Sequence, residues 1–371
     1  MSVLTDEKYF QGSYQYLEYV RSQVEQPLIC KDFFIDEYQV YLARLSGGDA
    51  ILLMLSVLDD EQYLALHKVA DSLNMSVLTE VSNEQEVSRA LALNASLIGI
   101  NNRDLRDLST DLATTERLRQ LIPNDKVVIS ESGIYTHKDV KRLAPLCDGF
   151  LIGSSLMAER DLEAACRKVI LGENKVCGLT RSQDAMAAYA SGAVYGGLIF
   201  YPKSPRYVDI DCAKQVTQSA PLAYVGVFVN APLEQVVDYA QSLKLAAVQL
   251  HGDENSEYIQ TLRKQLPLGC EIWKAQAVKG ELPKPLEGVD RHLYDTYSKS
   301  QKGGTGEAFD WSVLKTATVP FMLAGGLNPE NIHAALYRGA NGLDLNSGVE
   351  ASAGKKCQTK LQNAFSHIRN Y

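Results

Sequence analysis

The sequence lacks the long apolar run of a membrane span and the basic run of a protein that binds nucleic acid or membrane surfaces. No apolar stretch of the 371 residues approaches the roughly 20 residues that cross a bilayer, and the opening MSVLTDEKYF is not patterned like a signal peptide. The formal net charge is −8, which argues against both classes of partner. An anionic substrate would therefore need local groups to hold it.

The sequence also lacks the usual signatures of disulfides and metals. Its seven cysteines form no C-x-x-C pair, and their number is odd, which indicates reduced thiols and a cytoplasmic protein. The six histidines show no H-x-H or H-E-x-x-H pattern and no carboxylates at metal-ligand spacing. We therefore expect no catalytic metal.

Short apolar runs alternate with amphipathic stretches along the whole chain, which predicts parallel sheets covered by helices. The first half contains seven such runs, at 2–5, 27–33, 50–55, 75–81, 96–101, 126–132 and 149–154. The second half contains eight, at 175–178, 195–200, 223–229, 246–252, 271–276, 291–295, 320–326 and 341–347. Eight strand–helix units predict a closed (β/α)8 barrel. An open doubly wound sheet is the alternative, but no G-x-G-x-x-G follows the first strand.

These runs predict two tandem barrels, over residues 1–170 and 174–371. The stretch CRKVILGENK (166–175) is patterned as a helix that leads directly into the next strand, without a Gly/Pro/Ser linker. With seven runs instead of eight, the first barrel is expected to lack a strand.

Reactive side chains of parallel barrels lie at the carboxyl ends of strands, and this rule selects Cys177 and Asp295 in the second half. A thiol at Cys177 could be a buried filler, a metal ligand, a nucleophile or a base. Asp295 could simply cap a helix. It is followed, however, by a polar, glycine-rich stretch (296–311) that resembles a mobile lid.

Other strand ends of the second half predict an anion site. The loops LAGGLNPENI (323–332) and DLNSGVE (344–350) follow the seventh and eighth runs, where phosphate sites recur in this fold. Arg206, in FYPKSPR, could bind a carboxylate bidentately. His251 ends the fourth run and is interpreted as a substrate contact or a structural residue.

The motifs KVCGLTR, FYPKSPR, VGVFVN, VQLHGDE, GGTGEAFDW, LAGGLNPENI and GLDLNSGVE together resemble phosphoribosylanthranilate isomerase of tryptophan biosynthesis. The resemblance implies an Amadori rearrangement that uses no cofactor. It implies that Cys177 is the general base, Asp295 the general acid and Arg206 the contact to the anthranilate carboxylate. The substrate and its phosphate would be held by Gly326, Asp344, Asn346 and Ser347, with His251 beside them.

The strand ends of the first half carry a second polar set: Lys31, Glu80, Asn101, Glu131, Ser132, Gly153 and Ser154. Their motifs resemble indole-3-glycerol-phosphate synthase. The resemblance implies that Lys31 is the general acid and Glu80 the general base of a decarboxylating ring closure. Asn101, Glu131 and Ser132 would position the substrate, while Gly133, Gly153 and Ser154 would help to hold its phosphate.

The resemblance has one departure. The synthase family begins with a helical extension and a first strand that carries an active-site Glu and Lys, and MSVLTDEKYF corresponds to its second strand. We therefore expect a first barrel without its N-terminal helix and first strand, and little synthase activity in this chain.

Two alternatives remain open. The second half could be another phosphosugar enzyme, such as an epimerase or an aldolase, for which Lys274 is the nearest candidate for a Schiff-base lysine. The first half could be a non-catalytic packing partner. The expected ligands are phosphorylated anthranilate derivatives, with no nucleic acid or membrane. We expect a monomer if the barrel is complete, and association through exposed strand edges if it is not.

Overall fold

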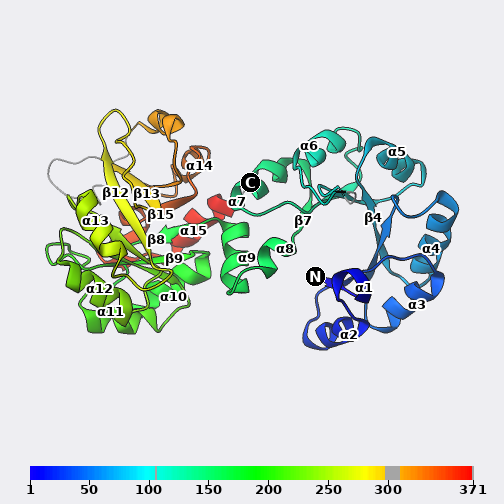
Figure 1. Cartoon of the computed structure of the whole chain (residues 1–371), viewed down its shortest axis with the longest axis horizontal. Coiled ribbons are helices and arrows are strands. Elements are labelled where there is room, and N and C mark those ends of the chain that lie inside the picture. The colour runs from blue at the N-terminus through cyan, green and yellow to red at the C-terminus, as the bar shows by residue number, and fades with distance from the viewer. Residues whose placement is uncertain (105–106, 297–309, 370–371) are drawn as a thin grey trace. The chain divides into compact units, whose positions relative to one another are not determined.

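The computed structural model describes residues 1–104, 107–296 and 310–369. The chain divides into two compact units, the first formed by Met1–Tyr135 with Asp139–Arg160 and the second by Thr136–Lys138 with Asp161–Tyr371. Figure 1 shows that each unit has its helices outside its strands. Each unit is described by itself below.

The first unit contains a parallel sheet of seven strands in the order β1-β2-β3-β4-β5-β6-β7. The strands are β1 (Ser2–Leu4), β2 (Ile29–Lys31), β3 (Ala50–Met54), β4 (Ser76–Val81), β5 (Leu97–Asn101), β6 (Val127–Glu131) and β7 (Gly149–Leu151). Each lies within one of the seven predicted runs, so that prediction is confirmed. Among the described residues, β1 and β7 are the two edges of this sheet.

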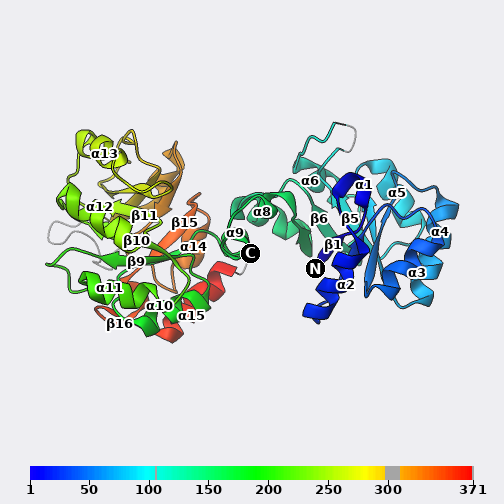
Figure 2. The ribbon, with the colours of Figure 1, turned by 60° about the horizontal axis from the view of Figure 1, so that its bottom comes forward.

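Helices connect these strands on the outer side of the sheet (Figure 2). They are α1 (Glu7–Phe10), α2 (Tyr14–Gln23), α3 (Glu37–Leu45), α4 (Asp60–Ser72), α5 (Glu84–Ala92), α6 (Ala113–Arg119), α7 (His137–Leu143), the 3-10 turn η1 (Ala144–Leu146) and α8 (Ser154–Met157).

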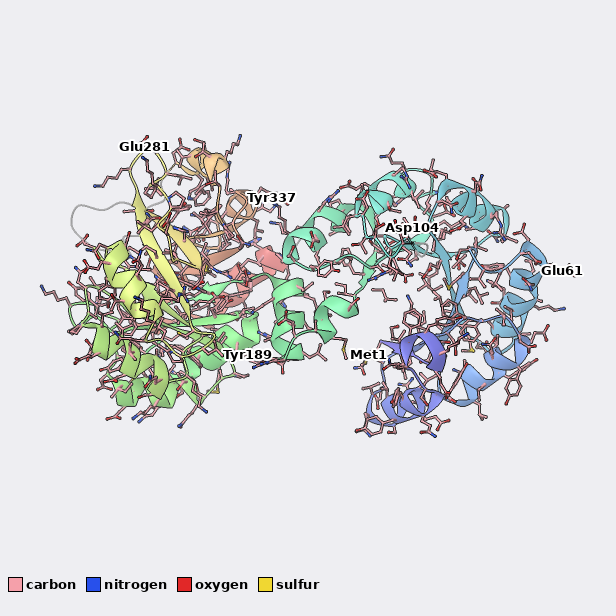
Figure 3. All side chains as sticks on the ribbon, in the orientation of Figure 1. Met1, Glu61, Asp104, Tyr189, Glu281 and Tyr337 are labelled. Atoms are coloured by element: carbon pink, nitrogen blue, oxygen red, sulfur yellow. The ribbon has the colours of Figure 1, made fainter. Side chains whose placement is uncertain are left out.

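Helix α4 shows how the sequence specifies these helices. Asp59 caps its N-terminus, and its side chain and that of Gln62 form a reciprocal capping box. Tyr63, Leu66 and Val69 follow at helical spacing and are buried. Glu61, on the solvent side of the same helix, projects outward in Figure 3. The amphipathic pattern predicted for residues 60–74 is thus a helix that ends at Ser72.

The second unit is a closed parallel barrel in the order β10-β11-β12-β13-β14-β15-β8-β9, which confirms the predicted (β/α)8 barrel. Its strands are β8 (Lys175–Val176), β9 (Tyr195–Ile199), β10 (Ala223–Phe228), β11 (Ala247–Leu250), β12 (Glu271–Val278), β13 (Arg291–Thr296), β14 (Phe321–Leu323) and β15 (Gly342–Leu345). Its helices are α9 (Leu162–Leu171), α10 (Ser182–Ser191), α11 (Ile210–Thr217), α12 (Leu233–Ser242), α13 (Ser256–Arg263), α14 (Ile332–Leu336) and α15 (Gln358–Arg369), with 3-10 turns η2 (Trp311–Thr316) and η3 (Ser347–Val349).

Two features of the second unit are absent from the sequence prediction. A short antiparallel hairpin, β16 (Glu350–Ser352) and β17 (Lys355–Lys356), follows η3. Helix α9 also packs on this barrel, since Arg167 Nη2 donates to the carbonyl oxygens of Tyr189 at 2.6 Å and Ala193 at 3.1 Å.

Side chains alternate between the interior and the outside of this barrel. Val176, Tyr294 and Leu345 belong to the large core between strands and helices, whereas Leu293 and Met322 belong to a separate core that fills the barrel. Because alternate residues of a strand face opposite sides, Lys175, Cys177, Asp295 and Asp344 face the interior.

Candidate active sites

Cys177 follows β8 directly and extends its pairing, because its N–H donates to Leu345 O at 2.8 Å. The residue is 4% exposed. Two glycines make room around the site, Gly197 for the thiol and Gly178 for Arg206 and Asn346. A Cβ on Gly197, in the neighbouring β9, would lie 2.7 Å from Cys177 Sγ. Gly178 has a φ of +71°, and a Cβ there would lie 2.7 Å from Arg206 Cδ and 2.9 Å from Asn346 Oδ1.

A buried ion pair lies beside this thiol. Lys175, two residues earlier on the same strand, is fully buried, and its Nζ lies 2.8 Å from Asp344 Oδ2. Burial raises the pKa of the Cys177 thiol, and the positive charges of Lys175 and Lys356 oppose that effect. Asp344 Oδ1 has no hydrogen-bond partner among the described residues.

Asp295, in β13, is a second buried acid of the same interior. Its Oδ1 accepts the N–H of Thr296 at 2.7 Å, and its Oδ2 lies 3.7 Å from Nε2 of His251. Burial raises the pKa of Asp295 to about 6, and the Asp344 carboxylate adds to that rise, while the Thr296 N–H and Lys175 oppose it. The carboxyl group is therefore partly protonated near neutral pH.

Arg206 is held by the hairpin that the sequence did not predict. Its Nε and Nη2 donate to Glu350 Oε1 at 2.9 Å and Oε2 at 2.7 Å. Glu350 is also bound by Lys356, whose Nζ donates to Oε1 at 2.8 Å and to Asn346 Oδ1 at 3.0 Å. The bidentate face of Arg206, predicted for a substrate carboxylate, is thus engaged by Glu350 in this structure.

The two predicted anion loops pack against each other. A Cβ on Gly348 would collide with the carbonyl of Leu327, so the loop after β15 fits closely under the loop after β14. Gly326, with a φ of +63°, has its carbonyl fixed by Asn331 Nδ2 at 2.9 Å. Asn346 and Ser347 lie at the start of η3. Most of the lid predicted over 296–311 lies outside the described residues.

In the first unit, three of the predicted ionisable groups meet. Lys31 Nζ, at the end of β2, lies 2.6 Å from Glu131 Oε2 in β6 and 3.8 Å from Glu80 Oε2 in β4. Burial and the charge of Glu131 raise the pKa of Glu80 to about 7, while Lys31 and a hydrogen bond from Asn101 oppose the rise. Glu131 is fully buried, and a Cβ on Gly99 would collide with its Oε1.

The remaining predicted residues of the first unit follow β6 and β7. Ser132 and Gly133 have φ values of +66° and +74°. Asn102, which the sequence analysis missed, fixes this turn, because its Nδ2 donates to Glu131 O at 3.0 Å and Ser132 O at 3.1 Å. Gly153 and Ser154 are exposed at the start of α8, where a Cβ on Gly153 would meet no atom within 4 Å.

Lys274 does not face the barrel interior, where a Schiff-base lysine would have to meet its substrate. It alternates with the inward-facing Trp273 and Ala275, and therefore faces away from the barrel interior. Its Nζ donates to Gly252 O at 2.7 Å and to Glu254 Oε2 at 2.9 Å.

Across the part of the chain that the structure describes, no three His, Cys, Asp or Glu residues are grouped to hold a metal ion. No described helix is long and apolar enough to span a membrane.

Comparison with known proteins now decides the family. Residues 1–169 match the family described as "Indole-3-glycerol phosphate synthase", and residues 174–367 match the family described as "N-(5'phosphoribosyl)anthranilate (PRA) isomerase". A "Tryptophan biosynthesis protein TrpCF" of Vibrio cholerae is 57% identical over 372 residues, which are 100% of this chain and 79% of that protein. The chain belongs to the TrpCF family. It is a bifunctional enzyme of tryptophan biosynthesis with a synthase half and an isomerase half.

The chain is also similar to a second TrpCF protein and to a solved isomerase structure. The TrpCF protein of Vibrio parahaemolyticus is 59% identical over 376 residues, covering 100% of this chain and 78% of that protein. Among solved structures, the phosphoribosyl anthranilate isomerase from Thermus thermophilus is 31% identical, with a TM-score of 0.47 over 53% of this chain and 98% of that one.

Proposed function

We propose that Cys177 and Asp295 are the base and the acid of the isomerase half of this TrpCF chain, acting on N-(5'-phosphoribosyl)anthranilate. In this mechanism Asp295 donates a proton to the ring oxygen of the ribose, and the ring opens to a Schiff base. The Cys177 thiolate then takes the proton from C2, which leaves an enolamine. The enolamine tautomerises to the ketose product.

The observation that carries this proposal is the placement of the two groups. Both face the interior of one closed barrel from different strands, and both are nearly fully buried. Burial raises the pKa of Asp295 to about 6, so part of the carboxyl population keeps its proton near pH 7. A general acid needs this property.

The substrate contacts proposed around this pair are Arg206, His251, Gly326, Asp344, Asn346 and Ser347. Asp344 Oδ1 lacks a partner among the described residues, which leaves it available to a sugar hydroxyl. Arg206 uses Nε and Nη2 for Glu350, so a substrate carboxylate would be bound through Nη1 or would displace Glu350. The loops of Gly326 and Ser347 are proposed to hold the phosphate.

For the synthase half we propose Lys31 as the acid and Glu80 as the base of the decarboxylating ring closure. The supporting observation is the cluster of Lys31, Glu80 and Glu131 at the ends of three strands. Asn101, Glu131 and Ser132 are proposed to position the substrate, and Gly133, Gly153 and Ser154 to contact its phosphate. The domain limits proposed for the two activities are 1–170 and 174–371.

We infer a cytoplasmic location from the seven free cysteines. The proposed partners of the chain are its phosphorylated, anthranilate-derived substrates. We also propose that the protein is a monomer if its first barrel is complete, and that it associates through the exposed edges of that sheet if it is not.

The test of the isomerase assignment is Cys177→Ala. Loss of a general base typically costs about 10²–10⁴ in rate. We therefore expect kcat with phosphoribosylanthranilate to fall by that factor while the circular dichroism spectrum is unchanged. Cys212→Ala, which removes another thiol of the same unit, is the control and should keep full activity. An unchanged kcat in Cys177→Ala would refute the assignment.

A further inference from the structure

Lys175 is a fully buried charge in the barrel interior for which the acid–base mechanism has so far given no role. It lies two residues before Cys177 on β8 and is paired in register with Asp344 across the β8–β15 junction. Its ammonium group and the Asp344 carboxylate are 2.8 Å apart. A buried ion pair is a costly way to fill space, because apolar side chains of similar volume fill such sites at least as well.

The Lys175 side chain reaches the thiol. A Cβ on Gly197 would lie 2.7 Å from Cys177 Sγ and 3.0 Å from Lys175 Cε, so both side chains converge over one glycine of β9. The side chain itself is 0% exposed, and it therefore cannot contact a substrate at the barrel mouth. Any effect of Lys175 on the reaction has to pass through the groups that it contacts.

The proposed reaction requires a negative charge on the sulfur of Cys177. A thiolate in a low-dielectric interior is disfavoured unless a positive group is near. The charged groups that face Cys177 are Lys175 from β8, Asp344 from β15, Lys356 from β17 and Arg206 from the loop after β9. The charges of Arg206 and Lys356 are shared with Glu350, as that of Lys175 is shared with Asp344, and Lys175 lowers the thiol pKa more than Lys356 does.

We propose that Lys175 is a positioning residue of the isomerase, which stabilises the thiolate form of Cys177 while Asp344 holds the ammonium group in place. This inference rests on the proposed role of Cys177 as the base. In each turnover the thiolate takes the C2 proton of the Schiff base and becomes a thiol, and Lys175 stays protonated throughout. Lys175 thus changes the population of the reactive form and does not transfer a proton.

The protonation states give this role a specific signature. Activity requires Asp295 protonated, with a pKa of about 6, and Cys177 deprotonated, with a pKa raised above the ordinary 9.0 by burial. Only the molecules with a protonated Asp295 and a deprotonated Cys177 are productive. Below the thiol pKa, each unit by which that pKa rises lowers this productive share tenfold. Once the pH exceeds the thiol pKa of both the wild type and a variant without the Lys175 charge, the difference between them disappears.

The test is the pH profile of kcat/KM for Lys175→Gln, measured from pH 6 to 10. Glutamine removes the charge but can still donate a hydrogen bond to Asp344. We expect a deficit of about tenfold or more at pH 7, which shrinks where the pH exceeds the raised pKa of the thiol. The absence of a deficit at pH 7 would overturn the proposal.

A matched control and a second readout keep the test decisive. Lys274→Met removes another buried lysine of this barrel with its own ion pair to Glu254, but on the outer side, so any loss should be independent of pH. The rate of Cys177 alkylation by iodoacetamide, followed on the peptide by mass spectrometry, reports the thiolate without turnover. It should fall at pH 7 in Lys175→Gln and not in Lys274→Met.

The double variant Lys175→Met/Asp344→Asn is the control for misfolding, because it removes both charges of the buried pair and leaves neither one unpaired. We expect its Cys177 to be alkylated faster at pH 7 than that of Lys175→Gln, because the Asp344 charge that raises the thiol pKa is removed as well. A rate no faster than that of Lys175→Gln would contradict the proposal. Failure of the inference is distinct from failure of the proposed function. An inactive Cys177→Ala beside a Lys175→Gln with wild-type activity and wild-type alkylation at pH 7 removes only the role of Lys175, whereas an active Cys177→Ala removes the base itself.

Discussion

A single methyl group on β9 tests whether the position of the thiol limits the isomerase. In Gly197→Ala the new Cβ would lie 2.7 Å from Cys177 Sγ, 2.9 Å from Cys177 Cα and 3.0 Å from Lys175 Cε. Contacts below 3.0 Å require a shift, and the Cα cannot move without its strand. Overpacking of this kind costs about 1–3 kcal/mol in the free energy of unfolding.

The neighbouring residue supplies a matched control. In Gly196→Ala the Cβ would lie 2.9 Å from Leu179 Cδ1 and 3.0 Å from Leu222 Cδ1. These contacts are made by the ends of flexible leucine side chains in the core between strands and helices. Gly196→Ala should therefore lose less stability than Gly197→Ala, and only Gly197→Ala displaces the thiol.

We expect Gly197→Ala to lower kcat about 10²-fold, since a displacement of about 1 Å at a reacting group costs that much. Gly196→Ala should keep kcat within a few-fold of wild type. Steady-state kinetics with phosphoribosylanthranilate, together with urea unfolding monitored by circular dichroism, measures both quantities. The reasoning is refuted if Gly197→Ala loses stability but not turnover, or if both variants lose turnover equally.

Three further predictions concern other parts of the two sites. Glu350→Gln weakens the paired hydrogen bonds that orient Arg206. We expect a higher KM for phosphoribosylanthranilate with a smaller change in kcat. A loss in kcat alone would contradict the proposed role of Arg206 in substrate binding. In the synthase half Glu80 must be deprotonated to act as the base. Any turnover should therefore fall as the pH drops through the Glu80 pKa of about 7. A rate that rises toward pH 6 would exclude Glu80 as the base. The sheet of the first unit is open among the described residues. A protein consisting of residues 1–371 should therefore show little synthase activity and normal isomerase activity. Comparable specific activities would show that the open sheet is sufficient for the synthase reaction.

The strands were predictable because both faces of a parallel sheet are buried, which produces continuous apolar runs. The run AILLML, for example, predicted a strand over 50–55, and β3 spans Ala50–Met54. The ends of helices and strands differ by a few residues from the prediction, as at Ser72, where α4 ends two residues early. Such ends depend on caps and fraying more than on apolar spacing.

The contacts that tune the sites were not predictable, because closure of the barrel creates them. Lys175 and Asp344 are 169 residues apart in the sequence and meet only because β15 pairs with β8. The bond between Arg206 and Glu350 joins residues 144 positions apart. It also depends on a hairpin whose strands of three and two residues leave no apolar run to detect. In the sequence Asn102 lies between Asn101 and Arg103, and no spacing pattern distinguishes it from Asn101.

The two units place a lysine against carboxylates at strand positions, yet burial gives the two lysines different chemistry. The side chain of Lys31 is 20% exposed and lies at the strand end, between Glu131 and Glu80. It can therefore reach a substrate and deliver a proton. The side chain of Lys175 is 0% exposed and lies two residues below the strand end. It can act on the substrate only through Cys177. In the proposed mechanisms the same residue type thus serves as an acid where its strand ends, and as a fixed positive charge where the strand continues above it.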